Sequence, residues 1–238
     1  MNILIVESKN DRCFIEALVK HLNLNKNVQV DAPICQIDDY ECLDGLNETK
    51  LTTKFRDVLD DVAKKDISKI GLLLDMDKET REIRIAFVNK ALSNALSQTD
   101  ASFTPIKNIA EFAKINLDAD TSVEIACFFT NVDGKGELET LLKAIKPNNQ
   151  VSNYADCLEH WRNCVGKDKV SDKDFGKLWL DFYIRWDTCS NKDRKQAGEK
   201  CSMKNFDKVM QKKGSKIFTL DHELLIPLSN FLQQFDAG

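Results

Sequence analysis

Acidic side chains stand at the ends of two short apolar segments of this chain. Glu7 follows residues 3–6 in the stretch NILIVESKND, and Asp75 and Asp77 follow residues 70–74 in the stretch IGLLLDMDKE. Two unit charges about 4 Å apart repel by about 4 kcal/mol at an effective dielectric constant of about 20, so clustered acids need a retained proton or a cation. Carboxylate oxygens suit a hard divalent ion such as Mg²⁺ or Mn²⁺, which also binds phosphate. The residue types therefore favour phosphoryl chemistry, although each acid by itself also suits a helix cap or a turn.

The elements around these acids predict that they meet at one edge of a sheet. Four apolar segments have the character of strands, at residues 3–6, 28–37, 70–74 and 123–130. Between them lie segments with apolar residues at helical spacing, and this alternation is typical of an α/β fold with a mainly parallel sheet flanked by helices. Side chains beyond the carboxyl ends of parallel strands converge. We therefore expect Glu7, Asp75 and Asp77 to lie together, with Glu79 near the start of the next helix.

Length and composition limit the domain organisation and the binding surfaces. The 238 residues, 42% of them hydrophobic, allow a sizeable core. We predict an α/β domain over residues 1–147 and a helical C-terminal region over residues 148–238 that packs on it. The net charge is only -4, so a surface for nucleic acid must be a local basic patch. No apolar run approaches the roughly 18 residues of a membrane span, and we expect a cytoplasmic protein without membrane contact.

The eight cysteines show no CxxC pair, and no histidine stands at zinc-finger spacing from them. Several of them lie inside apolar periodic segments. We therefore expect reduced thiols in an intracellular protein.

The segments ILIVES and DMDKE resemble the Toprim domain of topoisomerases, bacterial primases and several nucleases. That family has a glutamate after its first strand and an Asp-x-Asp after a later one. In type IA topoisomerases the motifs commonly read Val-Glu-Ser and Asp-x-Asp-x-Glu, which residues 6–8 and 75–79 match, whereas many other Toprim proteins have glycine in place of Ser8. The resemblance implies a divalent-metal-dependent nuclease in which Asp75 and Asp77 hold Mg²⁺ or Mn²⁺. Glu7 would bind the ion or act as general base, and Glu79 would complete the ligand set.

The later segment FFTNVDGKGELETLL is similar to one in an uncharacterised family of small stand-alone Toprim-like proteins. Gly136, Leu138 and Glu139 match that pattern, while the turn reads Thr-Asn-Val at residues 130–132 instead of the usual Pro-Asp-Asn. Glu137 and Glu139 stand at a helix N-terminus, where acids could supply further metal ligands or a second metal site, and we favour that role for Glu139. For Glu137 we favour the simpler explanation that acids are stabilised in the first turn of a helix by its dipole.

Cations for a polyanionic substrate are expected in the C-terminal region. Lys173 and Lys177 are one helical turn apart and could stabilise charge on a pentacoordinate phosphate, although a solvated helix face is the simpler explanation; we keep Lys173 as the catalytic candidate. A patch that could hold a nucleic-acid backbone, DNA or RNA, consists of Lys192, Arg194, Lys195, Lys212 and Lys213.

Two other functions fit part of the pattern. A signalling receiver also has acids at strand ends, but receivers place a pair of acids after the first strand, whereas Ser8 and Lys9 follow Glu7, and Asp77 and Glu79 would have no role. The stronger alternative is a non-catalytic Toprim-like module that binds metal or nucleotide. It would be an effector or sensor subunit of a partner ATPase, as in phage defence, and the resemblance also leaves a homodimer open.

Overall fold

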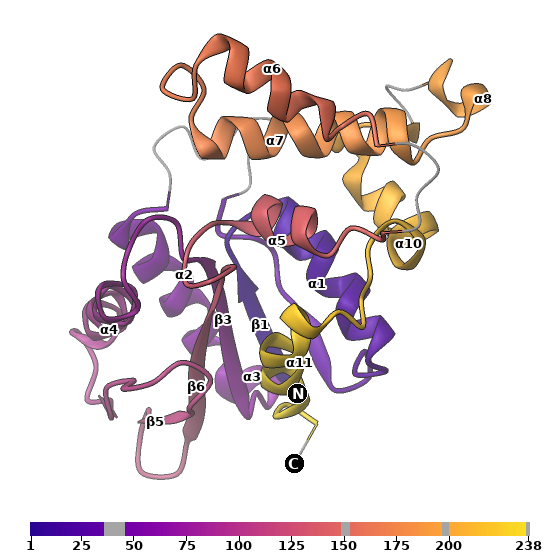
Figure 1. The fold of residues 1–238 in the computed structure, drawn as a ribbon. Coiled ribbons are helices and arrows are strands. Elements are labelled where there is room, and N and C mark those ends of the chain that lie inside the picture. The colour runs from indigo at the N-terminus through magenta and orange to yellow at the C-terminus, as the bar shows by residue number, and fades with distance from the viewer. Residues whose placement is uncertain (36–45, 149–152, 197–199, 237–238) are drawn as a thin grey trace.

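The computed structural model describes residues 1–35, 46–148, 153–196 and 200–236, and these form a six-stranded sheet with helices on both faces (Figure 1). In spatial order the strands are β2 (Val28–Val30), β1 (Asn2–Val6), β3 (Lys69–Asp75), β6 (Ser122–Thr130), β5 (Ala113–Asn116) and β4 (Ser102–Phe103). The first four are mutually parallel, and β5 and β4 are antiparallel additions at one edge. The predicted α/β fold with a mainly parallel sheet is confirmed.

Alternation of side chains along β1 divides the core into two layers. Ile3 and Ile5 face a core that contains α2 (Glu48–Asp60) and α4 (Arg81–Leu96), with the short α3 (Val62–Lys65) beside them. Leu4 and Val6 face the opposite core, which contains α1 (Lys9–His21) and α5 (Leu138–Ala144). The strand is apolar on both faces because helices cover both faces of the sheet.

Helices of the C-terminal region complete the second core. They are α6 (Cys157–Val165), α7 (Asp172–Phe182), a π-helical turn (Tyr183–Asp187), α8 (Asn191–Arg194), α10 (Phe206–Ile217) and α11 (Ile226–Gln233), with 3₁₀ turns at Met203–Asn205 and Glu223–Leu225. Trp179 and Phe235 are buried in the same cluster as Leu4 and Val6. In Figure 1, α7 lies beyond α5 and α11 lies beside β1. The helical region therefore packs on the sheet, whereas the boundary at residue 147 stays a prediction.

Gly71, in the middle of β3, makes room for this packing. A Cβ atom at position 71 would overlap Leu4 Cδ2 and lie 2.6 Å from Phe235 Cζ. We expect Gly71→Ala to lower the free energy of unfolding by about 1–3 kcal/mol through overpacking, measured by urea denaturation. The double variant Gly71→Ala, Phe235→Leu should recover part of this loss. Equal losses of unfolding free energy in the single and double variants would mean that the added methyl group does not clash with Phe235.

Two expectations about local structure were wrong. The second strand, expected over residues 28–37, ends at Val30; residues 36–37 lie outside the described part. Pro33 cannot donate a backbone hydrogen bond to a strand ladder. Beyond Val30 the contact with β1 and Glu7 continues through separate backbone hydrogen bonds, from Asp31 N–H to Leu4 O, from Ile34 N–H to Val6 O and from Cys35 N–H to Glu7 O.

The second error concerns the cysteines. Cys189 and Cys201 form a disulfide across the segment that contains α8, with their Cα atoms 6.1 Å apart. The sequence spacing showed no motif because the pairing depends on how this segment folds back. Four other cysteines are free thiols as expected: Cys13, Cys127, Cys157 and Cys164.

No helix in the described part of the chain is both long enough and apolar enough to cross a lipid bilayer.

Candidate metal centre

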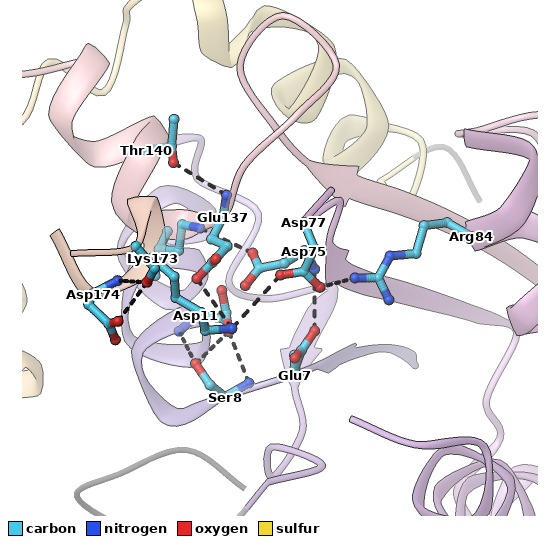
Figure 2. A network of polar contacts seen from close by, with 12 residues as sticks. Glu7, Ser8, Asp11, Asp75, Asp77, Arg84, Glu137, Thr140, Lys173 and Asp174 are labelled. Atoms are coloured by element: carbon cyan, nitrogen blue, oxygen red, sulfur yellow. Dashed lines mark hydrogen bonds and ion pairs between the residues drawn. The ribbon is translucent and has the colours of Figure 1, made fainter. Parts of the chain in front are cut away.

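The carboxyl ends of β1 and β3 bring Glu7 and Asp75 together. Val6 pairs with Leu73 in the parallel register, so the residue after β1 lies beside the last residues of β3. Glu7 Oε2 accepts a hydrogen bond of 3.3 Å from the backbone N–H of Asp75. Two residues that are 68 positions apart in the sequence thus share one site, as the sequence predicted (Figure 2).

The loop after β6 brings a third acid to this site. A tight turn at Asp133 and Gly134, both with positive φ, reverses the chain, and Gly136 then pairs with Asp77 through two backbone hydrogen bonds of 2.9 Å. This bridge places Glu137 against the end of β3. One carboxylate oxygen from each of Asp75, Asp77 and Glu137 lies within 4.8 Å of the other two. We call these three residues the acidic triad.

Gly136 is required by this geometry. Its φ is +99°, and an added Cβ atom would lie 2.7 Å from Thr140 Oγ1, whereas Gly134, with φ +81°, has open space around it. We expect Gly136→Ala to weaken divalent-metal binding by roughly tenfold, because the clash displaces Glu137, and to lower stability by about 1–3 kcal/mol. Calorimetric titration with Mn²⁺ and urea denaturation would measure the two effects.

Gly134→Ala is the matched control, because it introduces the same backbone strain without the clash. It should lower stability while leaving Mn²⁺ affinity within about twofold of the wild type. Equal losses of affinity in both variants would show that the clash with Thr140 is not what displaces Glu137.

Asp11 and Glu139 extend the acidic cluster into the protein. Asp11 is the third residue of α1, and its carboxylate accepts hydrogen bonds from the backbone and hydroxyl of Ser8, which caps the helix. The sequence analysis missed Asp11, although Ser8-x-x-Asp11 has the spacing of a capping box. Glu139 is in the first turn of α5 and only 8% exposed. No described residue other than Glu139 itself donates a hydrogen bond to its carboxylate.

Burial makes these carboxylates costly to ionise. It raises the pKa of Glu7 to about 7, with Asp11 adding to the effect, and it raises the pKa of Glu139 to about 7. Burial also raises the pKa of Asp75 well above its usual range, and Asp11, Glu7 and Glu139 act in the same direction. Asp75 Oδ1 accepts a hydrogen bond of 3.1 Å from the N–H of Leu138 at the start of α5. The cluster therefore has an excess of negative charge that a cation would relieve.

Two cationic side chains already approach the triad. The guanidinium of Arg84, on α4, forms an ion pair with Asp77 Oδ2, and its Nε donates a 3.2 Å hydrogen bond to the carbonyl of Met76. Lys173 Nζ, at the start of α7, lies 3.4 Å from Glu137 Oε2 and 3.8 Å from Asp77 Oδ1. Burial by itself would lower the pKa of Lys173, but the negative charges of Glu137, Asp77, Asp75 and Glu7 outweigh it and raise that pKa. Arg84 was missed because no sequence motif connects it with the acids.

The structure places Lys173 beside the acids, whereas Glu79 and the residues of the predicted basic patch lie outside the acidic triad. Glu79 is exposed beyond β3 and is not part of the acidic triad. The five residues of the predicted basic patch lie on α8, just after it, and on α10: Lys192, Arg194, Lys195, Lys212 and Lys213. Lys213 Nζ is 3.9 Å from Asp193 Oδ2, which links α10 to α8. Lys173 is the second residue of α7, and the nine residues of the helix after it span about 14 Å at 1.5 Å per residue. Figure 1 shows α8 beyond the C-terminal end of α7.

A family model described as "Protein of unknown function (DUF3226)" matches residues 1–236. The chain belongs to this family. The matched range contains the acidic triad, Lys173 and the C-terminal helices alike. No curated protein and no solved structure matches the chain significantly.

The donor set fits a hard divalent cation. Mg²⁺ binds oxygen at about 2.1 Å, so two oxygens bound to one ion lie no more than about 4.2 Å apart, and the three oxygens of the acidic triad all lie within 4.8 Å of one another. The buried carboxylate of Glu139, without a donor from another described residue, is a further anionic group for such a site. Glu7 is held beside Asp75 by the hydrogen bond to its backbone.

Proposed function

We propose that this protein is a divalent-metal-dependent nuclease that hydrolyses phosphodiester bonds of nucleic acid. The observation that carries the proposal is the acidic triad at the carboxyl ends of β3 and β6, with Glu7 bonded to the backbone of Asp75. The resemblance of ILIVES and DMDKE to Toprim motifs adds support, because in that family the same acids hold the metal. When bound, Mg²⁺ or Mn²⁺ would act as a Lewis acid on the phosphate and lower the pKa of a bound water.

Asp75, Asp77 and Glu137 hold the ion in this proposal. Glu139 lies behind them as a further anionic group. A general base works best with a pKa near the operating pH, and the pKa of Glu7 is raised to about 7 by burial, so Glu7 is suited to accept the proton of the attacking water. Glu79 has no part in this ligand set, because its exposed side chain lies outside the acidic triad.

The basic patch is proposed to bind the nucleic-acid backbone away from the scissile bond. The length of α7 after Lys173, about 14 Å, separates the two, so a bound strand would span several nucleotides between them. Arg194 stacks over the ring of Trp186, with 5.0 Å between the guanidinium carbon and the ring centroid, and the indole is 41% exposed. Cations at this spacing would hold the backbone whatever its sequence, so binding should weaken with added salt.

The test is incubation of the purified chain with plasmid DNA, total RNA and tRNA, each with Mg²⁺, Mn²⁺ or a chelator. Cleavage that requires the metal supports the proposal, and the three substrates distinguish DNA from RNA. If every substrate survives while divalent metal still raises the melting temperature, the protein is better described as the non-catalytic metal-binding subunit of a partner ATPase. If metal changes neither cleavage nor melting, the metal site itself is refuted.

A further inference from the structure

The two cations beside the acidic triad differ in how firmly they are held. The side chain of Arg84 is 10% exposed and bonded to both Asp77 and the carbonyl of Met76, so it is a fixed part of the site. The side chain of Lys173 is 43% exposed and contacts only carboxylates among the partners described, Asp77 and Glu137. A lysine has a flexible four-carbon stem and a strongly hydrated head, so its ammonium can move into solvent at low cost.

Lys173 contacts two of the three carboxylates whose oxygens would bind a metal. Its ammonium lies 3.4 Å from Glu137 Oε2 and 3.8 Å from Asp77 Oδ1, and these two acids belong to the group whose oxygens lie within 4.8 Å of one another. A divalent ion bound to those oxygens would be separated from the ammonium by only a few ångströms. Two positive groups at that distance repel each other, so the ammonium in its present position and the metal disfavour each other.

We propose that Lys173 is an internal counter-ion of the metal site: it neutralises Asp77 and Glu137 without metal and is displaced when a divalent cation binds. The inference rests on the metal site of the proposed function and adds a regulatory device to it. Metal occupancy and the position of the Lys173 side chain become coupled, so each disfavours the other by the same factor. The displaced ammonium is then free to interact with an anionic substrate.

The device connects the C-terminal helices with the site on the sheet. Lys173 is in the first turn of α7, and α7 approaches α5 closely at Gly176, where an added Cβ atom would lie 3.3 Å from Glu139 Cβ. The same helix continues through the π-helical turn toward α8, which carries part of the basic patch. Displacement of Lys173 thus changes the contacts at the N-terminal end of the helix that leads to the predicted nucleic-acid surface.

Three variants test the proposal through metal affinity rather than activity. Lys173→Met should bind Mn²⁺ about tenfold more tightly than the wild type in calorimetric titration, while its melting temperature in chelator falls. Lys173→Arg keeps the positive charge and should restore weak binding. Lys169→Met is the matched control, since Lys169 is an exposed lysine four residues earlier that pairs with Asp168 at 3.5 Å, and it should change neither quantity.

A labelling experiment separates displacement from simple removal of a positive charge. Acetylation of lysines by an amine-reactive ester, read by mass spectrometry, should modify Lys173 severalfold faster in Mg²⁺ than in chelator, with Lys169 unchanged. If Lys173→Met does not tighten Mn²⁺ binding, or if metal leaves the labelling of Lys173 unchanged while it binds, the counter-ion role is refuted and the nuclease proposal stands. If neither wild type nor Lys173→Met binds metal, both fail together.

Discussion

Replacing Asp75 with asparagine should lower metal-dependent cleavage by about a thousandfold or more, equivalent to on the order of 4 kcal/mol in the transition state. Asp75 interacts both with the other acids of the triad and with Glu7. Its side chain belongs to the acidic triad, its backbone binds Glu7, and the charges of Glu7 and Glu139 act on it. Asparagine keeps an oxygen for the N–H of Leu138 but loses the charge that a cation requires. Single-turnover cleavage with saturating Mg²⁺ is the measurement.

The fold of this variant should survive and even gain stability without metal. Burial raises the pKa of Asp75, so its ionised form is disfavoured in the native state, and removal of the charge should raise the melting temperature in chelator at pH 8. The stabilisation by divalent metal should be lost. Glu79→Gln is the control, because this exposed acid resembles a Toprim ligand in sequence but lies outside the triad. A loss of cleavage in Glu79→Gln as large as in Asp75→Asn would contradict the proposed ligand set.

Stability in the absence of metal should fall as the pH rises from about 4.5 to about 7. Glu7 and Glu139 have folded-state pKa values of about 7, raised by burial from 4.5. Between these values the native state binds more protons than the unfolded state, so the free energy of unfolding decreases with pH and levels off above about pH 7. A shift of this size corresponds to about 3 kcal/mol for each carboxylate considered alone. Bound Mg²⁺ should flatten the curve, because it favours the ionised carboxylates.

Glu7→Gln measures the contribution of Glu7 to this pH dependence of stability. The variant should match the wild type in stability near pH 4.5, where Glu7 is protonated, and exceed it by about 3 kcal/mol at pH 8 in chelator. Glu82→Gln is a control for which the opposite result is expected. Hydrogen bonds from the N–H of Glu82 itself and from Thr80 lower the pKa of this exposed carboxylate at the start of α4. Removal of the Glu82 charge should therefore lower stability above pH 4.5. Urea denaturation at a series of pH values measures both. An unchanged difference between Glu7→Gln and wild type across the pH range would refute the raised pKa.

Local patterns were sufficient for the fold class and for the central pair of acids. Apolar strands that end in Glu7 and Asp75 and alternate with helical periodicity predict a parallel sheet, and in a parallel sheet the carboxyl ends of neighbouring strands share one edge. The meeting of Glu7 with Asp75 follows from that rule without knowledge of any side-chain contact. The domain boundary at residue 147 and the function stay predictions.

Tertiary structure decided the rest of the site, because the position of each further residue depends on contacts between different segments of the chain. Glu137 depends on the paired backbones of Asp77 and Gly136, and Lys173 depends on how α7 packs over α5. Arg84 reaches Asp77 from one turn inside α4. In the same way the disulfide of Cys189 and Cys201 depends on a chain reversal. Spacing in sequence determines which face of one element a residue occupies, whereas partners between elements are chosen by packing, which involves the whole core at once.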